Sequence, residues 1–220
     1  MRTAGNRTHF REAAFAPMNK TRTLVYVVVL AVLSYWTWHQ YFPSRAAQIA
    51  AAETRMWQAY YRRETMTLGS ELAGLLRGQF ELSVDESNDI ARSIGLAAVT
   101  FYSSSGNYEN AVLPNLVRAY QQLRDRSGRT FNPEAAARAE LTWWVARRTP
   151  GQNNIENIGR CISHLYATLY DGPRPEFDEA GLLRARAASL RDQGGEDCDW
   201  REVERLLEKS YKILLAAVAQ

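Results

Sequence analysis

The sequence predicts an all-α protein with an N-terminal single transmembrane helix followed by an antiparallel multi-helix bundle of about seven helices. Three observations lead to this prediction. Residues 23–43 form an apolar run without Asp, Glu, Lys or Arg. From residue 44 onward, apolar residues recur three and four positions apart, which is the spacing of one helix face, and no run alternates as a half-buried strand would. Capping residues, glycines and prolines divide this region into segments of helical length.

The apolar run has the length and the residue types of a membrane-spanning helix. About 20 residues of helix rise about 30 Å, which is the thickness of the hydrocarbon core of a bilayer. Small and branched apolar residues fill the first half, whereas the second half is rich in aromatic residues: Tyr35, Trp36, Trp38 and Tyr41. Aromatic side chains gather in this way at membrane–water interfaces. Pro43 then predicts a break before the next helix.

A cleaved signal peptide is the alternative interpretation of the same run. Its apolar core would be residues 24–33, and Ser44 and Ala46 would supply the small residues near a cleavage site. Bulky aromatic and polar residues separate that core from the small residues. The uncleaved anchor is therefore favoured.

The distribution of charge predicts what the protein does not bind. Residues 1–22 form a short basic tail with five basic residues and one acidic residue, a net charge of +4. The whole chain carries +3, so residues 23–220 carry −1. The domain at residues 44–220 therefore offers no basic field to attract phosphates, and we expect no nucleic-acid partner.

The basic residues that flank the apolar run also predict its orientation, because such residues favour the cytoplasmic side. Four precede the run within twenty residues, and three follow it within twenty: Arg45, Arg55 and Arg62. This bias and the short tail predict a cytoplasmic N-terminus and an extracytoplasmic C-terminal domain. Of the 27 basic residues 24 are arginine, which with the many alanines suggests a GC-rich bacterial genome. The expected location is the inner (plasma) membrane.

Seven helices are expected after the anchor, at residues 44–77, 83–102, 114–125, 132–148, 155–170, 178–194 and 199–218. Three of them begin at a residue that can cap a helix with its side chain: Ser44, Asn132 and Asp178. Two others begin with the spacing of a capping box, in Ser83 with Glu86 and in Asp199 with Glu202. The connections are short, which favours antiparallel neighbours.

Three glutamates on apolar helix faces, Glu53, Glu64 and Glu140, are the candidates for a metal site. Inward-facing glutamates bind two metals in some helical bundles, usually with a histidine three residues after two of them. No Glu-x-x-His occurs here, and His164 is the single histidine of residues 44–220. The favoured interpretation is therefore structural, because a buried carboxylate needs a partner. We expect Glu53 or Glu140 to pair with one of three arginines: Arg77, Arg147 or Arg148.

Two aromatic clusters contain Trp57 with Tyr60 and Trp143 with Trp144. Aromatic residues at helical spacing most often belong to the core, and the alternative is that they line a pocket for an apolar ligand such as a lipid or quinone. The two cysteines, Cys161 and Cys198, lack metal-ligand spacing. Free thiols are favoured for them, and a disulfide in an exported domain is the alternative.

The functional prediction follows from the anchor and from the motifs that the sequence lacks. It contains no Gly-x-Ser-x-Gly nucleophile elbow and no Gly-rich phosphate loop. We expect no catalytic residues and no cofactor, and a non-enzymatic membrane-anchored accessory or scaffold protein. Its expected partners are the lipid bilayer and another membrane or membrane-associated protein. The alternative is a helical-bundle enzyme or carrier with a carboxylate metal site, or with an apolar cofactor or lipid pocket near the membrane.

Overall fold

The computed structural model describes residues 20–41 and 43–219, and within these residues the protein is all-α, without a strand. Side chains are described for residues 24–35 and 43–219. The chain divides between Pro43 and Ser44 into two compact units. The first contains α1, and the second is the helical domain.

Helix α1, Lys20–Tyr41, covers most of the predicted anchor. Every side chain described in it, from Leu24 to Tyr35, is exposed, and none of them is charged. The predicted aromatic end at residues 36–41 lies outside the described side chains, and residues 1–19 of the basic tail lie outside the described residues. In the part of the chain that the structure describes, no helix is both long and apolar enough to cross a membrane. The membrane-spanning role of residues 23–43 stays a prediction.

The domain contains nine α-helices and one 3₁₀ helix within residues 44–219, more than the seven expected. Their bounds are α2 Arg45–Arg62, α3 Thr65–Phe80, α4 Val84–Ser103, α5 Tyr108–Ala111, α6 Leu113–Ser127, α7 Pro133–Arg148, α8 Ile155–Leu169, α9 Pro175–Gly194, η1 Gly195–Asp197 and α10 Trp200–Val218. The all-α prediction is confirmed, and the helix count was wrong at two places.

The first miscounted place is the predicted single helix over residues 44–77, which is two helices. Arg63 adopts a left-handed conformation, with φ 60° and ψ 31°, and ends α2. Its backbone N–H donates to the carbonyl oxygens of Ala59 and Tyr60, which closes the last turn. The break contains neither glycine nor proline, so no residue type marks it in the sequence. The second place is α5, a single turn that forms before Pro114.

The predicted caps are mostly present. Ser44 Oγ accepts from the Ala47 amide, and Ser83 with Glu86 forms a complete capping box. Asn132 and Asp199 also cap their helices. The cap predicted at Asp178 was wrong, because α9 begins earlier, at Pro175, and the Asp178 carboxylate accepts from Ser163 Oγ at 2.5 Å.

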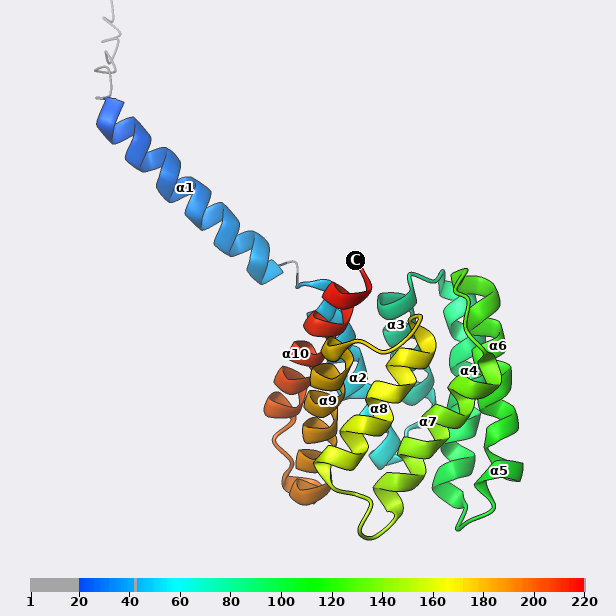
Figure 1. Ribbon diagram of the computed structural model, residues 1–220. Coiled ribbons are helices and arrows are strands. Elements are labelled where there is room, and N and C mark those ends of the chain that lie inside the picture. The colour runs from blue at the N-terminus through cyan, green and yellow to red at the C-terminus, as the bar shows by residue number, and fades with distance from the viewer. Residues whose placement is uncertain (1–19, 42, 220) are drawn as a thin grey trace, which may run out of the picture. The chain divides into compact units, whose positions relative to one another are not determined.

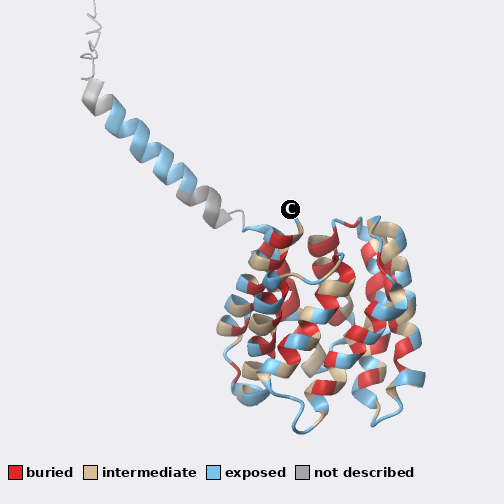
Figure 2. Ribbon diagram, viewed as in Figure 1, coloured by how far each residue is buried: buried red, intermediate tan, exposed pale blue. Residues whose placement is uncertain are grey.

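The longer helices of the domain form a closed ring (Figure 1). Each packs against the longer helix before it and the one after it, and α10 packs against α2. The closest approach is between α8 and α9, where a Cβ added to Gly181 would lie 2.5 Å from the carbonyl oxygen of Gly159. Figure 2 shows the buried residues on the faces that the helices turn toward one another.

The ring has two ends, which we name after residues of α2. The Ser44 end carries the start of α2 and the end of α10, and it is the end that continues into α1 through residues 42 and 43. The Arg62 end carries the C-terminal ends of α2, α4, α7 and α9. Hydrogen bonds join these ends, since Arg148 of α7 donates to Phe101 O of α4 at 2.7 Å and to Tyr60 Oη of α2 at 3.2 Å.

Candidate functional site

Glu53 of α2 is the one charged residue in the described part of the domain that is fully buried, with an exposed fraction of 0%. Its Oε1 accepts from Nε and Nη2 of Arg184 on α9, at 2.9 and 2.5 Å. Its Oε2 accepts from the Tyr211 hydroxyl of α10 at 2.6 Å. Burial alone would lower the pKa of Arg184, but Glu53 and the neighbouring tyrosines raise it well above its ordinary value. Glu53 is therefore held as an ion pair that joins three helices.

Glu140 of α7 has different partners. Its Oε2 accepts from Tyr120 Oη at 2.9 Å and its Oε1 from Trp144 Nε1 at 2.8 Å. The Trp143 indole N–H faces the same carboxylate without forming a hydrogen bond of normal geometry. Burial raises the pKa of Glu140 above its ordinary value, and this effect exceeds the opposing effects of Arg184 and of the hydrogen bonds. The Glu140 carboxylate is thus surrounded by neutral donors.

Glu64, the third predicted candidate, does not join these two. It is exposed at the start of α3 and makes no side-chain cap there. Among the described residues, no group of three His, Cys, Asp or Glu side chains could hold a metal ion. His164, the histidine of the domain, is exposed on α8.

Glu53 has an arginine partner, but the identity expected for it was wrong. Arg77 donates to Ser87 Oγ at 3.3 Å, and Arg147 forms an ion pair with Asp192 at 2.7 Å. Arg148 donates to backbone carbonyls at the end of α4. Arg184 takes the place expected for these residues. No local pattern marked it, because it lies 131 positions from Glu53 along the chain.

The two aromatic clusters of the sequence meet inside the Arg62 end of the ring. Trp57 and Trp143 are buried, and the Arg147 guanidinium lies 5.7 Å from the Trp57 ring and 5.8 Å from the Trp143 ring. Trp144 packs on the core, with its ring 5.3 Å from that of Phe101. Both cysteines are free thiols, as favoured: Cys161 is half-buried and Cys198 is buried.

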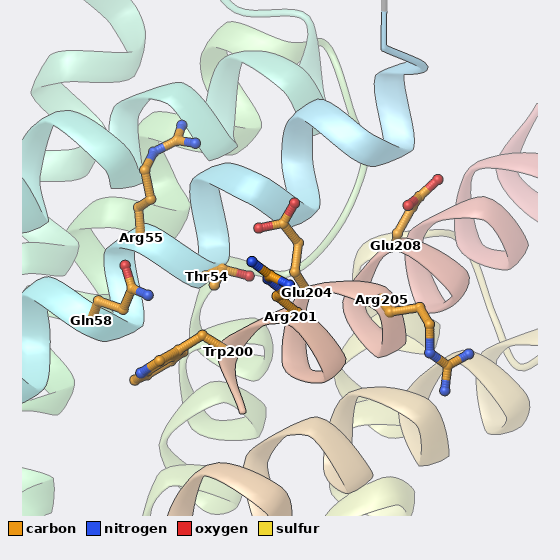
Figure 3. A pocket seen from close by; sticks show the side chains of 8 residues that line it. All are labelled: Thr54, Arg55, Gln58, Trp200, Arg201, Glu204, Arg205 and Glu208. Atoms are coloured by element: carbon orange, nitrogen blue, oxygen red, sulfur yellow. The ribbon is translucent and has the colours of Figure 1, made fainter. Parts of the chain in front are cut away.

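A groove of about 300 Å³ lies between α2 and α10. Figure 3 shows the side chains that line it, which come from these two helices alone. Several of its charges already have partners within the domain: Arg55 with Glu71 at 2.8 Å, and Glu208 with Lys212 at 2.6 Å. These pairs describe a solvated charged surface.

A second groove, of about 190 Å³, lies where the end of α2, the start of α3 and the second half of α4 meet. Its lining includes the apolar side chains of Ala59, Leu68 and Val99, the rings of Tyr60 and Tyr102, and Arg63 at one side. The Arg63 guanidinium donates to Tyr102 Oη from Nε at 3.2 Å and from Nη2 at 2.9 Å, and it lies 5.0 Å from the centre of the Tyr102 ring.

Two exposed large apolar side chains of the domain, Val99 and Tyr102, line this second groove. In the described part of the domain, the others are Met66, Val84 and Leu96. Apart from Val84, all of them lie at the start of α3 or in the second half of α4, and we call Met66, Leu96, Val99 and Tyr102 the apolar patch. Exposed apolar residues that lie on neighbouring segments mark an interaction site more often than singly scattered ones do.

The sequence analysis missed this patch, although a signal was present. Helix α4 carries apolar residues on two faces: one face is buried through Ile90, Ala97 and Phe101, and the patch residues occupy another. A helix with one partner layer needs only one apolar face. The additional apolar face of α4 is left uncovered by the described helices of the ring.

No protein-family model matches this chain, and neither the curated proteins nor the solved structures that were searched contain a match. The grooves and exposed side chains of the domain are therefore the observations that bear on its function.

Proposed function

We propose that this chain is a non-enzymatic, membrane-anchored accessory protein whose helical domain binds another protein. Residues 23–43 would anchor it in the inner membrane of a bacterium, with the N-terminus in the cytoplasm and the domain outside it. The apolar patch would be the binding surface. The observation that carries the proposal is the concentration of exposed apolar side chains at one groove of an otherwise charged domain surface.

The exposed apolar side chains of α1 support the membrane attachment. Leu24, Leu30 and Leu33 are each more than half exposed, and the whole stretch from Leu24 to Tyr35 is uncharged. Twelve consecutive exposed residues of this kind are costly in water and stable in a bilayer. The sequence continues the uncharged run on both sides of this stretch, to a length of about 20 residues that matches the hydrocarbon core.

The hydrogen bonds that Glu53 and Glu140 already accept support a binding role over metal chemistry. Both Glu53 oxygens already accept hydrogen bonds from Arg184 and Tyr211. Both Glu140 oxygens accept from an aromatic side chain. A metal would have to displace these donors, and the displaced Arg184 guanidinium would then lose its buried counter-ion.

The anchor is tested by substituting Leu30→Arg, because a charge at the centre of a membrane helix costs about 2.5–3.5 kcal/mol on insertion. The native chain is expected to remain with membranes after alkaline carbonate extraction, and the variant to be released in large part. Leu96→Arg, on the domain surface, is the control and should stay with the membrane. Release of the native chain by carbonate would disprove the anchor.

The binding role is tested in living cells with a photo-crosslinking amino acid at position 96. We expect one discrete crosslinked product, which Val99→Asp abolishes because the new charge lies in the patch. The same amino acid at Gln121, an exposed position of α6, is the control and should give no product. Absence of a product from both position 96 and position 66 would contradict a binding role for this surface.

A further inference from the structure

The side chains around the second groove indicate the chemistry of the binding partner, an inference that rests on the proposed binding function. Along α4, Leu96, Val99 and Tyr102 are three residues apart, so they form one stripe that is about 9 Å long at 1.5 Å per residue. On α3, Met66 is 88% exposed and lies beside this groove in sequence, between the lining residues Thr65 and Leu68. The stripe is long enough to cover nearly two turns of a partner helix.

The same two helices each carry a glycine that faces open space. Gly69 of α3 and Gly95 of α4 are helical positions at which an added Cβ would meet no atom within 4 Å. An amphipathic helix packs on a surface of exposed apolar side chains through residues at positions i, i+3, i+4 and i+7.

The charge of Arg63 indicates which side chain the partner carries. Arg63 forms no ion pair with any carboxylate among the described residues, and its hydrogen bonds go to a neutral phenol. Tyr102 holds the guanidinium through Nε and Nη2, so its position at the side of the groove is fixed before any partner arrives. A guanidinium held in this way is suited to bind a carboxylate, because charge-assisted hydrogen bonds are the stronger kind.

The side chains around the groove favour a protein helix as the occupant. The exposed apolar residues of α4 recur at helical spacing, and the Arg63 guanidinium beside them has no carboxylate partner among the described residues. We infer that the apolar patch receives an amphipathic helix of another protein, and that this helix places an Asp or Glu carboxylate against Arg63.

The test uses three fluorescent 16-residue helical peptides with the same leucine face and with Glu, Gln or Lys at one flanking position, titrated by anisotropy against the full chain in nanodiscs. The Glu peptide should bind at least tenfold more tightly than the Lys peptide, with the Gln peptide between them. Arg63→Asn, which tolerates the left-handed backbone, should remove this order. The matched control Arg62→Asn should preserve it, and Val99→Asp should abolish binding of all three peptides.

The outcomes separate this inference from the proposed function. Equal binding of the three peptides, abolished by Val99→Asp, would overturn the acidic partner and leave the binding surface intact. Binding that Val99→Asp does not change, or no binding at all, would overturn the docking of a helix in this groove. A dimer of the full chain that Val99→Asp dissociates in sedimentation would assign the patch to a second copy and would also overturn the inference.

Discussion

Glu53 and Glu140 occupy similar places in the sequence and different environments in the fold. Each is an acid on an apolar helix face, and Arg184 influences both. Glu53 bonds to the guanidinium directly and is fully buried, whereas Glu140 bonds to a phenol and an indole and is only partly buried. Arg184 thus donates hydrogen bonds to Glu53, whereas the donors to Glu140 are Tyr120 and Trp144. The partners of Glu53 come from α9 and α10, the last two α-helices of the sequence.

The largest effect is expected from removing the arginine. Arg184→Met leaves Glu53 charged and buried without a counter-ion, so the free energy of unfolding should fall by about 3–5 kcal/mol. Chemical denaturation of the purified chain measures this. Arg186→Met, at an exposed position of the same helix, is the control and should change little. The double variant Glu53→Met with Arg184→Met should recover most of the loss, because it removes both charges. A single variant as stable as the native chain would refute the buried ion pair.

A smaller loss is expected from removing the phenol that serves Glu53. Tyr211→Phe deprives the Oε2 of a fully buried carboxylate of its donor, at a cost of about 1.5–3 kcal/mol. Thermal or denaturant unfolding of the variant gives the value. Loss of less than about 0.5 kcal/mol would mean that water replaces the hydroxyl there, contrary to the burial of this site.

The matched substitution at the other carboxylate should cost less. Tyr120→Phe removes one donor from Glu140, but Trp144 still donates to the other oxygen and the residue as a whole is half-buried. We expect a loss of about 0.5–1.5 kcal/mol, measured under the same conditions as Tyr211→Phe. The comparison fails if the Tyr120 variant proves the less stable of the two.

The smallest change in stability is expected at Glu140 itself, and it depends on pH. Because the folded-state pKa of Glu140 is raised above 4.5, the folded protein binds its proton more tightly than the unfolded chain does. The contribution of Glu140 to stability is therefore greatest below pH 4.5 and is lost as the pH rises through the folded-state pKa. Glu140→Gln should remove this loss. The stability of the variant relative to the native chain should then rise as the pH is raised from 4 to 7.

This titration is read from unfolding curves at several pH values. A difference between the two proteins that stays constant from pH 4 to pH 7 would place the pKa of Glu140 at its ordinary value. Glu179→Gln, at an exposed position, serves as the control for adding an amide on the surface.

Local signals in the sequence predicted the parts of the fold that depend on neighbouring residues. Ser83 with Glu86 and Asn132 marked helix starts correctly because capping is decided within four residues. The break at Arg63 escaped prediction because its left-handed conformation is one that arginine seldom adopts, so the residue type carries no signal for it. That an inward glutamate needs a polar partner was predictable, since a buried carboxylate without hydrogen bonds or a counter-ion is costly.

The parts of the candidate site that depend on distant pairing could not be predicted. Arg184 was indistinguishable from other arginines of residues 44–220 until the ring placed α9 against Glu53. For the apolar patch, the second apolar face of α4 was visible in the sequence, but the spacing of Leu96, Val99 and Tyr102 equals the spacing of core residues. Only the closed ring tells which of the two apolar faces is already covered.

Closure of the ring by α10 against α2 also has a consequence for how the protein is made. Glu53 and Tyr211 are separated by 158 positions, so at about 5–20 residues per second the ribosome needs about 8–30 s to deliver the second after the first. During that interval the α2 face that will pack on α10 has no partner, and the Glu53 carboxylate must stay in water. The domain therefore reaches its native core only when its last helix has been synthesised, and a nascent chain that stalls before α10 would present an unpaired apolar surface to chaperones and proteases.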